Sequence, residues 1–373
     1  MTEEATARDE VNDAQKGSTV MEVILQEQPS NPSCWEALTE SEIGSVKQTE
    51  AYNVALAKSS MRKCGKSGLV LATVGGDLIG GCAFAAIPSA IPFKSYKIID
   101  DGPLVLDEDT RTEITETIIK TVTRLNPGFF CPGILVKDSL GQIGPDVVKA
   151  LGLHTYVGGC TFRVNLRKTE EELWRSLRQN ARRGVRKAML EGYHAVTDTK
   201  GDFLEAFSEI LRATMERGGE HYWQESILAA YRKHMFPAGL ARLQIVLTDR
   251  NEVAEGALVL CDPNKHRLYY YFAASSSQLR GRWAGDLLVW EIIKRGASEG
   301  YSTFDLGGVP CSPRPGTKTG GIFSFKSKWG GTFVHEYHHV NMAYLLSRKL
   351  GELPLPSHLK QTAERITKLV TAR

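Results

Sequence analysis

Apolar residues gather in two similar arrangements, one in each half of the chain. Residues 69–83 read LVLATVGGDLIGGCA, and residues 243–257 read LQIVLTDRNEVAEGA. Each stretch is an apolar run rich in β-branched residues, a turn of glycine or polar residues, and a second apolar run that passes through a glycine, Gly81 or Gly256. This pattern predicts a β-hairpin, and the interior glycine predicts a bulge or a close backbone approach.

The elements expected after each hairpin follow in the same order, which is a strand, an amphipathic helix and a further strand. They cover residues 96–100, 110–125 and 131–137 in the first half, and 267–274, 287–299 and 302–306 in the second half. The repeated order predicts a duplicated α/β (α+β) unit, in which each half forms a mixed twisted sheet flanked by helices.

The join between the two units is expected near residues 155–170, where a strand at 160–166 leads into a basic segment. Residues 1–19 carry few apolar side chains and are expected to form a disordered tail. Helical stretches at 342–350 and 358–371 close the chain. We therefore predict a first domain at 20–160 plus 332–373 and a second domain at 161–331.

The composition is that of an ordinary globular protein. The chain has 373 residues, 42% hydrophobic and 24% charged, which is enough for two cores. No apolar run approaches the length that spans a bilayer, and the first residues are not signal-like, so a cytoplasmic protein is expected. The seven cysteines are dispersed and never in CxxC spacing. We expect neither a disulfide framework nor a zinc knuckle, and a reducing compartment.

One segment concentrates positive charge. Residues 174–190, WRSLRQNARRGVRKAML, hold six cations and no acid, although the formal net charge of the whole chain is only +3. Four arginines follow at i, i+3, i+7 and i+11, which predicts one stripe along a single helix. They are Arg175, Arg178, Arg182 and Arg186. Guanidinium groups grip phosphates bidentately, so the stripe indicates a phosphate-bearing ligand, with a solvated helix face as the alternative.

Five stretches between residues 48 and 330 carry a family resemblance. They are QTEAY at 48–52, DGPL at 101–104, RRGVRKAMLEG at 182–192, YFAAS at 271–275, and the pair FDLGG at 304–308 and FKSKWG at 325–330. Their order resembles that of the FemABX family, the tRNA-dependent aminoacyltransferases that build peptidoglycan cross-bridges. Tyr52 stands where the family favours tryptophan, Asp101 where it favours arginine, and Ala273 where it favours glycine.

The resemblance implies two tandem GNAT-like domains, without the coiled-coil arm that some members insert. The predicted order of a hairpin, a strand through a glycine, a helix and a strand is also that of the GNAT acyltransferase fold. In that fold two strands splay apart at the bulge, and backbone groups there face the acyl donor.

The resemblance also implies a site for aminoacyl transfer. Transfer to an amine passes through a tetrahedral oxyanion, which a nearby cation can stabilise. The resemblance gives this role to Lys326 and places the main-chain carbonyl of Phe325 beside the attacking amine. The implied substrate-binding residues are Arg182, Arg183 and Arg186 for a diphosphate, with Tyr271, Tyr52 and Lys58, although the family's lysine lies closer to the aromatic residue than Lys58 does. On local sequence alone, a surface lysine, a solvated helix and a core tyrosine remain the alternatives.

The implied substrates are an aminoacyl-tRNA and a nucleotide-linked or lipid-linked peptide precursor whose amine accepts the aminoacyl group. No cofactor and no metal is implied, because the ester of the charged tRNA is already activated. The alternatives are an acyl-CoA-dependent N-acyltransferase on the same fold, a tRNA-dependent ligase for a small peptide natural product, and a catalytically silent binding module. Residues 278–285, QLRGRWAG, lack the final small residue of a pyrophosphate-binding loop, which disfavours CoA.

Two other candidates have simpler interpretations. His335 and His339 fall on one face of an expected strand at 332–340, roughly 13 Å apart, which is too far for one metal ion. Asp305 ends an expected strand, and we expect it to cap the following turn instead of acting as a base.

Overall fold

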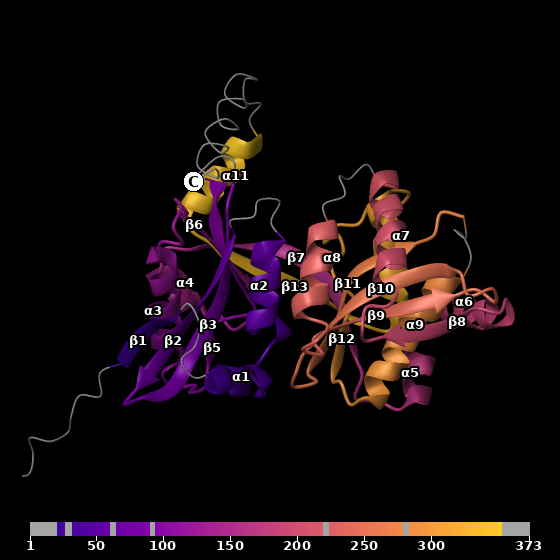
Figure 1. Ribbon diagram of the computed structural model, residues 1–373, viewed down its shortest axis with the longest axis horizontal. Coiled ribbons are helices and arrows are strands. Elements are labelled where there is room, and N and C mark those ends of the chain that lie inside the picture. The colour runs from indigo at the N-terminus through magenta and orange to yellow at the C-terminus, as the bar shows by residue number, and fades with distance from the viewer. Residues whose placement is uncertain are drawn as a thin grey trace, which may run out of the picture.

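The computed structural model describes residues 21–26, 32–59, 65–89, 94–218, 224–278 and 283–352. Figure 1 shows two lobes side by side, with strands β7 (His154–Asn165) and β13 (Thr332–Val340) running between them. The expected tail at 1–19 and the expected helix at 358–371 lie outside the described residues. Within the described ranges, no helix combines the length and apolar content needed to cross a membrane.

The element order predicted for the two halves is confirmed. The first lobe contains β1 (Met21–Gln26), α1 (Pro32–Glu40), η1 (Val46–Gln48), α2 (Glu50–Lys58), β2 (Lys66–Val74), β3 (Asp77–Ile87), β4 (Tyr96–Asp100), β5 (Leu104–Val105), α3 (Arg111–Arg124), β6 (Gly133–Asp138) and α4 (Pro145–Ala150). The second lobe contains α5 (Glu170–Ser176), α6 (Gln179–Leu190), β8 (His194–Asp198), α7 (Leu204–Arg217), α8 (Gln224–His234), β9 (Ala241–Leu247), β10 (Val253–Cys261), β11 (Arg267–Ser275), α9 (Ala284–Ser298), β12 (Thr303–Asp305), α10 (Lys318–Lys326) and η3 (Ser327–Trp329). Helix α11 (Met342–Glu352) follows β13 and packs beside β6 of the first lobe.

The described strands form one sheet whose two halves mirror each other. Its order is β1-β2-β3-β4-β6-β13-β7-β12-β11-β10-β9-β8, with β5 paired to β3. The ladders β1 to β4 and β8 to β11 are antiparallel, and each is followed by a parallel partner, β6 or β12. At the centre β13 pairs with both β6 and β7, and β7 pairs with β12. One continuous set of backbone hydrogen bonds therefore joins the lobes.

Both hairpins carry the same bulge. Gly75 and Gly76 have φ of +59° and +93°, a turn conformation that matches the twist of the flanking strands. The register shifts between Ala72 and Thr73 in the first hairpin, and between Val253 and Glu255 in the second. Each bulge therefore lies just before the glycine instead of at it, which corrects the predicted position. The predicted close approach is confirmed, because a Cβ on Gly81 would come within 2.7 Å of the Trp35 ring.

A glutamine side chain fills the gap between β3 and β4. The two strands pair only where Ala85–Ile87 meets Tyr96–Ile98. Beyond that point Nε2 of the fully buried Gln48 donates to the carbonyl oxygens of Ala83 at 3.2 Å and Asp100 at 2.9 Å. Its Oε1 accepts from the Ala83 amide at 2.9 Å. Strands β3 and β4 of this lobe therefore separate, and the side chain of Gln48 fills the space between them.

The lobes also share an apolar core. Helix α2 of the first lobe packs against α8 of the second, as Figure 1 shows. Tyr52 and Ala55 from α2 lie in one buried cluster with Phe207 of α7 and Tyr231 of α8. Burial of apolar surface between the lobes therefore adds to the shared sheet in holding them together.

Candidate active site

Lys326 is the last residue of α10 and lies beside the loop that follows β12. Its ammonium donates to the carbonyl oxygen of Gly308 at 3.0 Å and lies 5.8 Å from the ring centroid of Tyr270. The next turn, η3, is anchored by Trp329, which is fully buried in the second-lobe core. The anchored turn keeps the lysine half-buried over the loop.

Asp305, at the end of β12, organises this loop. Its Oδ1 accepts from the Gly307 amide at 2.9 Å and from Oγ1 of Thr161 at 2.5 Å, and its Oδ2 accepts from Nε of Arg163 at 3.0 Å. Gly307 adopts a φ of +70°, and a Cβ there would meet the carbonyl oxygen of Tyr270 at 2.6 Å. The prediction that Asp305 caps the turn is confirmed.

Burial changes the acidity of the lysine. Desolvation lowers the pKa of the Lys326 ammonium to about 8, and the Asp305 carboxylate opposes this shift. Because about 8 is still above neutral pH, most molecules keep the ammonium protonated in that range. A desolvated ammonium is a strong electrostatic partner for an oxyanion.

The neighbouring lysine has a different setting. Lys328 donates to Oδ1 of Asp286 at 2.6 Å, and both side chains are largely buried. Its ammonium also lies 4.6 Å from the ring centroid of Phe325, whose ring packs edge-on to Trp329. Lys328 therefore forms a largely buried ion pair with Asp286 inside the second lobe.

A buried acid near this pair was not singled out from the sequence. Burial, reinforced by Asp286, raises the pKa of Glu255 to about 8. A Cβ on Gly285, in the first turn of α9, would lie 3.2 Å from Oε1 of Glu255. The sequence feature that could have indicated Glu255 is a carboxyl group within an apolar strand, directly before Gly256. The carboxyl group of Glu255 thus lies beside the first turn of α9, which also contains Asp286.

Tyr52 and Tyr271, both predicted to bind substrate, are brought together between the lobes. The hydroxyl of Tyr52 donates to Oδ2 of Asp100 at 3.1 Å. Burial, with Asp100 and Tyr271 beside it, raises the pKa of Tyr52 well above its usual value. The Tyr271 ring also lies 5.7 Å from that of Tyr231 on α8.

Two lysines neutralise Asp100. Lys47 lies 3.2 Å from Oδ1, and Lys137 lies 3.1 Å from Oδ2. Burial alone would raise the pKa of the Asp100 carboxyl, but these two cations hold it well below its usual range. Lys47 also contacts Asp101 at 3.1 Å. Asp101, which stands where the family favours arginine, is therefore paired with Lys47, the residue directly before Gln48.

Strand β11 separates the two groups of candidate residues. Tyr269 and Tyr271 pack on the side of the shared core and Tyr270 on the opposite side, as the alternation predicted. Lys326 lies over Tyr270, whereas Tyr52 belongs to the Tyr271 side. Lys58 joins neither group: it is exposed at the end of α2, where its charge adds to the burial that lowers the pKa of His234.

The predicted arginine stripe needs a correction. The basic segment is not one helix, because α5 ends at Ser176 and α6 begins at Gln179. Arg175 pairs with Glu171 on α5, and Arg178 is the residue before α6. The helix breaks at Leu177, where the backbone is extended and the side chain is buried in the core. Helix propensity along the sequence does not reveal this burial.

The three arginines expected to bind a diphosphate also differ from one another. Arg182 is half-buried, and its Nη1 donates to the carbonyl oxygens of Trp174, Arg175 and Leu177 at 3.5, 2.9 and 2.9 Å. Arg183 and Arg186 are exposed, and the Arg186 guanidinium lies 5.4 Å from the ring centroid of Trp174.

We expect Arg182→Gln to lower the free energy of unfolding by about 1–3 kcal/mol, because the last carbonyls of α5 lose their donor. Arg186→Gln is the matched control, since it removes the same charge from an exposed site and should change stability by less than about 0.5 kcal/mol. Urea denaturation of both variants measures the difference. Equal stability of the two variants would show that the contacts of Arg182 contribute little.

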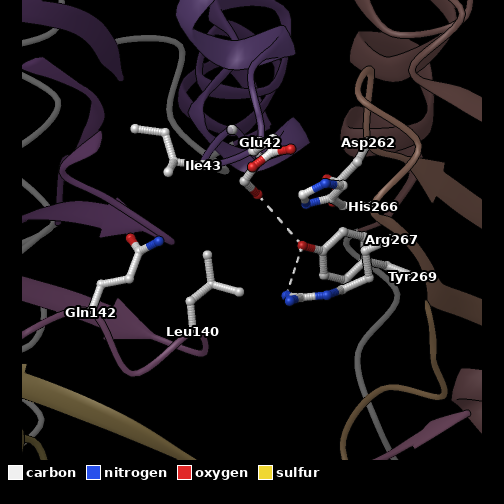
Figure 2. A pocket seen from close by; sticks show the side chains of 10 residues that line it. Glu42, Ile43, Leu140, Gln142, Asp262, His266, Arg267 and Tyr269 are labelled. Carbon is white, nitrogen blue, oxygen red and sulfur yellow. Dashed lines mark hydrogen bonds between the residues drawn. The ribbon is translucent and has the colours of Figure 1, made fainter. Parts of the chain in front are cut away.

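A cavity of about 170 Å³ lies between the lobes, and Figure 2 shows its lining. Residues of the first lobe face residues of the second across it. They are Glu42, Ile43, Leu140 and Gln142 on one side, and Asp262, His266, Arg267 and Tyr269 on the other. Nη1 of Arg267 donates to the hydroxyl of Tyr269 at 3.2 Å, which lies 3.4 Å from Oγ of Ser45. Polar contacts thus cross between the lobes here.

The histidines of β13 have separate partners. His339 is buried, 2.8 Å from Oγ1 of Thr155 and 3.5 Å from Oδ2 of Asp138. The His335 ring packs edge-on to Phe333. No group of three or more metal-ligating side chains is arranged for an ion in the part of the chain that the structure describes.

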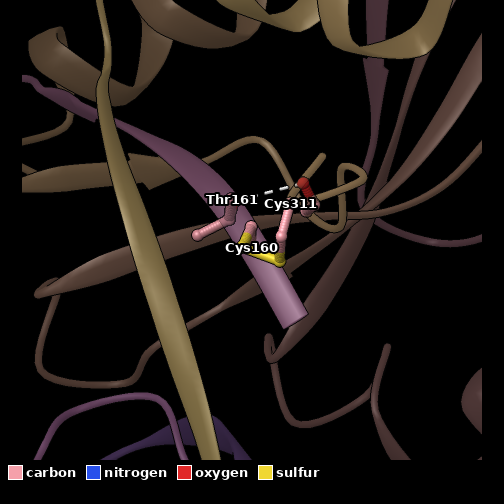
Figure 3. The surroundings of a disulfide bond; sticks show 4 residues. Cys160, Thr161 and Cys311 are labelled. Carbon is pink, nitrogen blue, oxygen red and sulfur yellow. Dashed lines mark hydrogen bonds between the residues drawn. A yellow bond between two sulfur atoms is a disulfide. The ribbon is translucent and has the colours of Figure 1, made fainter. Parts of the chain in front are cut away.

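Cys160 of β7 and Cys311 form a disulfide, with their Cα atoms 5.3 Å apart (Figure 3). It ties the loop that begins at Gly307 to the strand whose next residue, Thr161, donates to Asp305. The expectation that the dispersed cysteines make no disulfide is wrong for this pair. The two residues are 151 positions apart, and the pairing of β7 with β12, together with the backbone bridge between Cys160 and Val309, brings them together.

Comparisons with known proteins agree with this architecture. Residues 175–326 match the acetyltransferase (GNAT) domain family. A lipid II:glycine glycyltransferase of Staphylococcus haemolyticus is 29% identical over 119 residues, which is 30% of this chain and 25% of that protein. A protein of the same name from Staphylococcus epidermidis matches to the same extent, with 29% identity over 30% of this chain and 25% of the relative. The matched stretch thus spans about a quarter of the length of these relatives.

Solved structures match over most of the chain. A crystal structure of FemX superposes with a TM-score of 0.69 at 16% identity, over 88% of this chain and 98% of that chain. A tandem GNAT protein from the clavulanic acid biosynthesis pathway gives a TM-score of 0.54 at 16% identity, over 87% of this chain and 99% of that one. The fold of this chain is therefore similar to that of FemX and of a tandem GNAT protein, and its second half matches the GNAT domain family.

Proposed function

We propose that this protein is an aminoacyltransferase that moves an aminoacyl group from an aminoacyl-tRNA to an amine of a lipid-linked cell-wall precursor peptide. The observation that carries the proposal is the half-buried Lys326 ammonium, held 3.0 Å from the Gly308 carbonyl. The sequence resemblance assigns the role of the family's catalytic lysine to this residue. The relatives named lipid II:glycine glycyltransferase support a lipid-linked acceptor.

The reaction needs one cation at the site of charge development. The acceptor nitrogen attacks the ester carbonyl carbon, and the carbonyl oxygen becomes an oxyanion. Lys326 leaves the Gly308 carbonyl and stabilises that oxyanion, while the carbonyl of Phe325 accepts a hydrogen bond from the attacking amine. The tetrahedral intermediate then expels the ribose hydroxyl, which takes up the proton that the amine gives up. An amide forms, an ester bond breaks, and the ester supplies the driving force.

Two features speak against acyl-CoA as the donor. The separation between β3 and β4 is filled by Gln48, so the first lobe has no open slot between these two strands. In the first turn of α9, where a pyrophosphate would bind, a Cβ on Gly285 would lie 3.2 Å from Oε1 of Glu255, so this side chain lies where the phosphate would approach.

The direct test is incubation of the purified protein with a mixture of radiolabelled aminoacyl-tRNAs and candidate acceptors in detergent. The expected result is that label becomes stable to mild base, because an ester has become an amide, and that it migrates with a lipid-linked peptide. Label on a soluble small peptide would favour the natural-product ligase. Binding of a precursor with no transfer from any charged tRNA would indicate a silent binding module. A thermal shift with acetyl-CoA and transfer from it would favour the N-acyltransferase.

The pH dependence provides a second test. Since Lys326 has a pKa of about 8, the protonated fraction falls tenfold per pH unit above that value. Arginine stays protonated throughout this range. We therefore expect the ratio of the wild-type kcat to that of Lys326→Arg to be constant below pH 8 and to fall about tenfold per unit above it. Glu255→Gln should keep this dependence, whereas its loss in that variant would assign the titration to Glu255.

A further inference from the structure

The outward face of α6 combines exposed cations with exposed apolar side chains. Arg183, Lys187 and Leu190 follow at i, i+4 and i+7 and so share one face of the helix. Leu190 is 86% exposed and Met189 is 49% exposed, whereas Arg183, Arg186 and Lys187 are exposed around them. Among the residues whose exposure the structure describes, Leu190 is the most exposed large apolar side chain. Soluble surfaces seldom carry a leucine this open beside a cluster of cations.

The helix cannot rotate to hide this face. Its other face is made of the small side chains of Ala181, Gly184 and Ala188, with Val185, all buried. A Cβ on Gly184 would clash with Oδ2 of Asp286 in α9 at 1.7 Å, so α6 lies directly against α9. Close packing of small residues fixes the orientation of a helix, and here it directs the cations and Leu190 outward.

Two tryptophans flank the cations. The Arg186 guanidinium lies 5.4 Å from the Trp174 ring centroid, and the Lys187 ammonium lies 5.0 Å from that of Trp283. Both indoles are half-buried. Cations beside indoles at the edge of an apolar patch are typical of surfaces that lie at a membrane interface. One acid, Glu191, follows at the end of the helix.

We propose that this face of α6 docks the protein on an anionic membrane surface, with the cations on lipid phosphates and Leu190 and Met189 in the boundary between headgroups and acyl chains. The inference rests on the proposed function in one respect: a lipid-linked acceptor would require the protein to work at a membrane. The phosphates of an RNA backbone could also bind the cations, but Leu190 would then stay exposed to water. The exposed apolar side chains therefore favour lipid.

The position of α6 suits this role. At its start the amide of Arg178 donates to the carbonyl oxygen of Lys328 at 3.0 Å, two residues from Lys326. Helix α6 has twelve residues and lies on the outer side of the second lobe, as Figure 1 shows. At about 1.5 Å per residue the helix is about 18 Å long. Docking of this face therefore places the Lys326 loop within about 20 Å of the membrane surface.

The test is co-sedimentation of the full chain with vesicles of phosphatidylcholine alone or with about a third phosphatidylglycerol. We expect binding to the anionic vesicles only, and weaker binding at about 0.5 M salt. Arg183→Gln with Lys187→Gln should reduce partitioning roughly 25-fold, since each cation contributes about fivefold. Leu190→Ser should reduce it about tenfold and keep the salt dependence. The matched control is Lys120→Gln with Lys149→Gln, which removes two exposed cations from the first lobe and should bind as the wild type does.

Other results would overturn the inference. Binding to neither vesicle, or equal losses in the α6 and control variants, would exclude a membrane-docking role for this face. If Leu190→Ser bound vesicles normally and the double α6 variant lost affinity for uncharged tRNA in a filter assay, the face would be an RNA site. Transfer in detergent tests the proposed function separately. Vesicle binding without any transfer would contradict that function alone, and transfer without vesicle binding would contradict the docking alone.

Discussion

Replacing Lys326 by alanine is expected to lower kcat for aminoacyl transfer by roughly 10²–10³-fold, with less than about threefold change in the KM for the acceptor. The ammonium is half-buried, so water cannot fully replace it in stabilising the oxyanion. Its resting partner is a protein carbonyl, that of Gly308, so its loss removes little ground-state binding. Steady-state kinetics with saturating charged tRNA and varied acceptor measure both parameters.

Lys328→Ala is the matched control because it removes the same group two residues away. Lys328 is paired with Asp286 at 2.6 Å, with side chains only 12% and 7% exposed. We expect this variant to lose about 2–4 kcal/mol of stability and, where folded, to keep kcat within about threefold. A raised acceptor KM with unchanged kcat in Lys326→Ala would instead identify Lys326 as a residue that binds the ground state.

Replacing Gln48 by leucine is expected to lower the free energy of unfolding by about 3–5 kcal/mol. The side chain is fully buried and makes three hydrogen bonds to the backbone of Ala83 and Asp100, at 3.2, 2.9 and 2.9 Å. Leucine has a similar volume but no polar atoms, so these backbone groups would be buried without partners. Urea denaturation followed by tryptophan fluorescence gives the change.

Gln142→Leu is the control for this substitution. Gln142 lines the cavity between the lobes and is half-buried, so water can reach it and a loss below about 1 kcal/mol is expected. A similar small loss in Gln48→Leu would mean that β3 and β4 close on each other once the glutamine is gone. In that case the slot between the strands would not depend on this side chain.

Local patterns predicted the elements and their order well. The hairpin turn at Gly75 and Gly76, the strand at 96–100 and the helix at 110–125 depend on residues close together in the sequence. The alternation of Tyr269, Tyr270 and Tyr271 likewise follows from the strand period. The catalytic role of Lys326 stays a prediction from the resemblance, and the structure adds the Gly308 carbonyl that holds the side chain.

Long-range contacts account for what the sequence analysis missed. The disulfide of Cys160 with Cys311, the ion pair of Lys328 with Asp286 and the lysines around Asp100 all join segments brought together by the sheet. The broken basic helix has the same origin, because Leu177 packs into the core where a continuous helix was expected. Charge spacing alone could not separate the cations that bind protein carbonyls from those that face solvent.

The duplicated order of elements, the tight turns and the glycines at which the backbone approaches closely could all be predicted from local sequence, because they depend on backbone preference and on residue type. The tertiary structure alone decided that Gln48 closes the gap between β3 and β4, that Lys326 is desolvated while Lys328 is paired, and that α6 turns its cations and Leu190 outward. Burial and pairing depend on which distant segments share the sheet and its cores, and the crossing strands β7 and β13 set that arrangement.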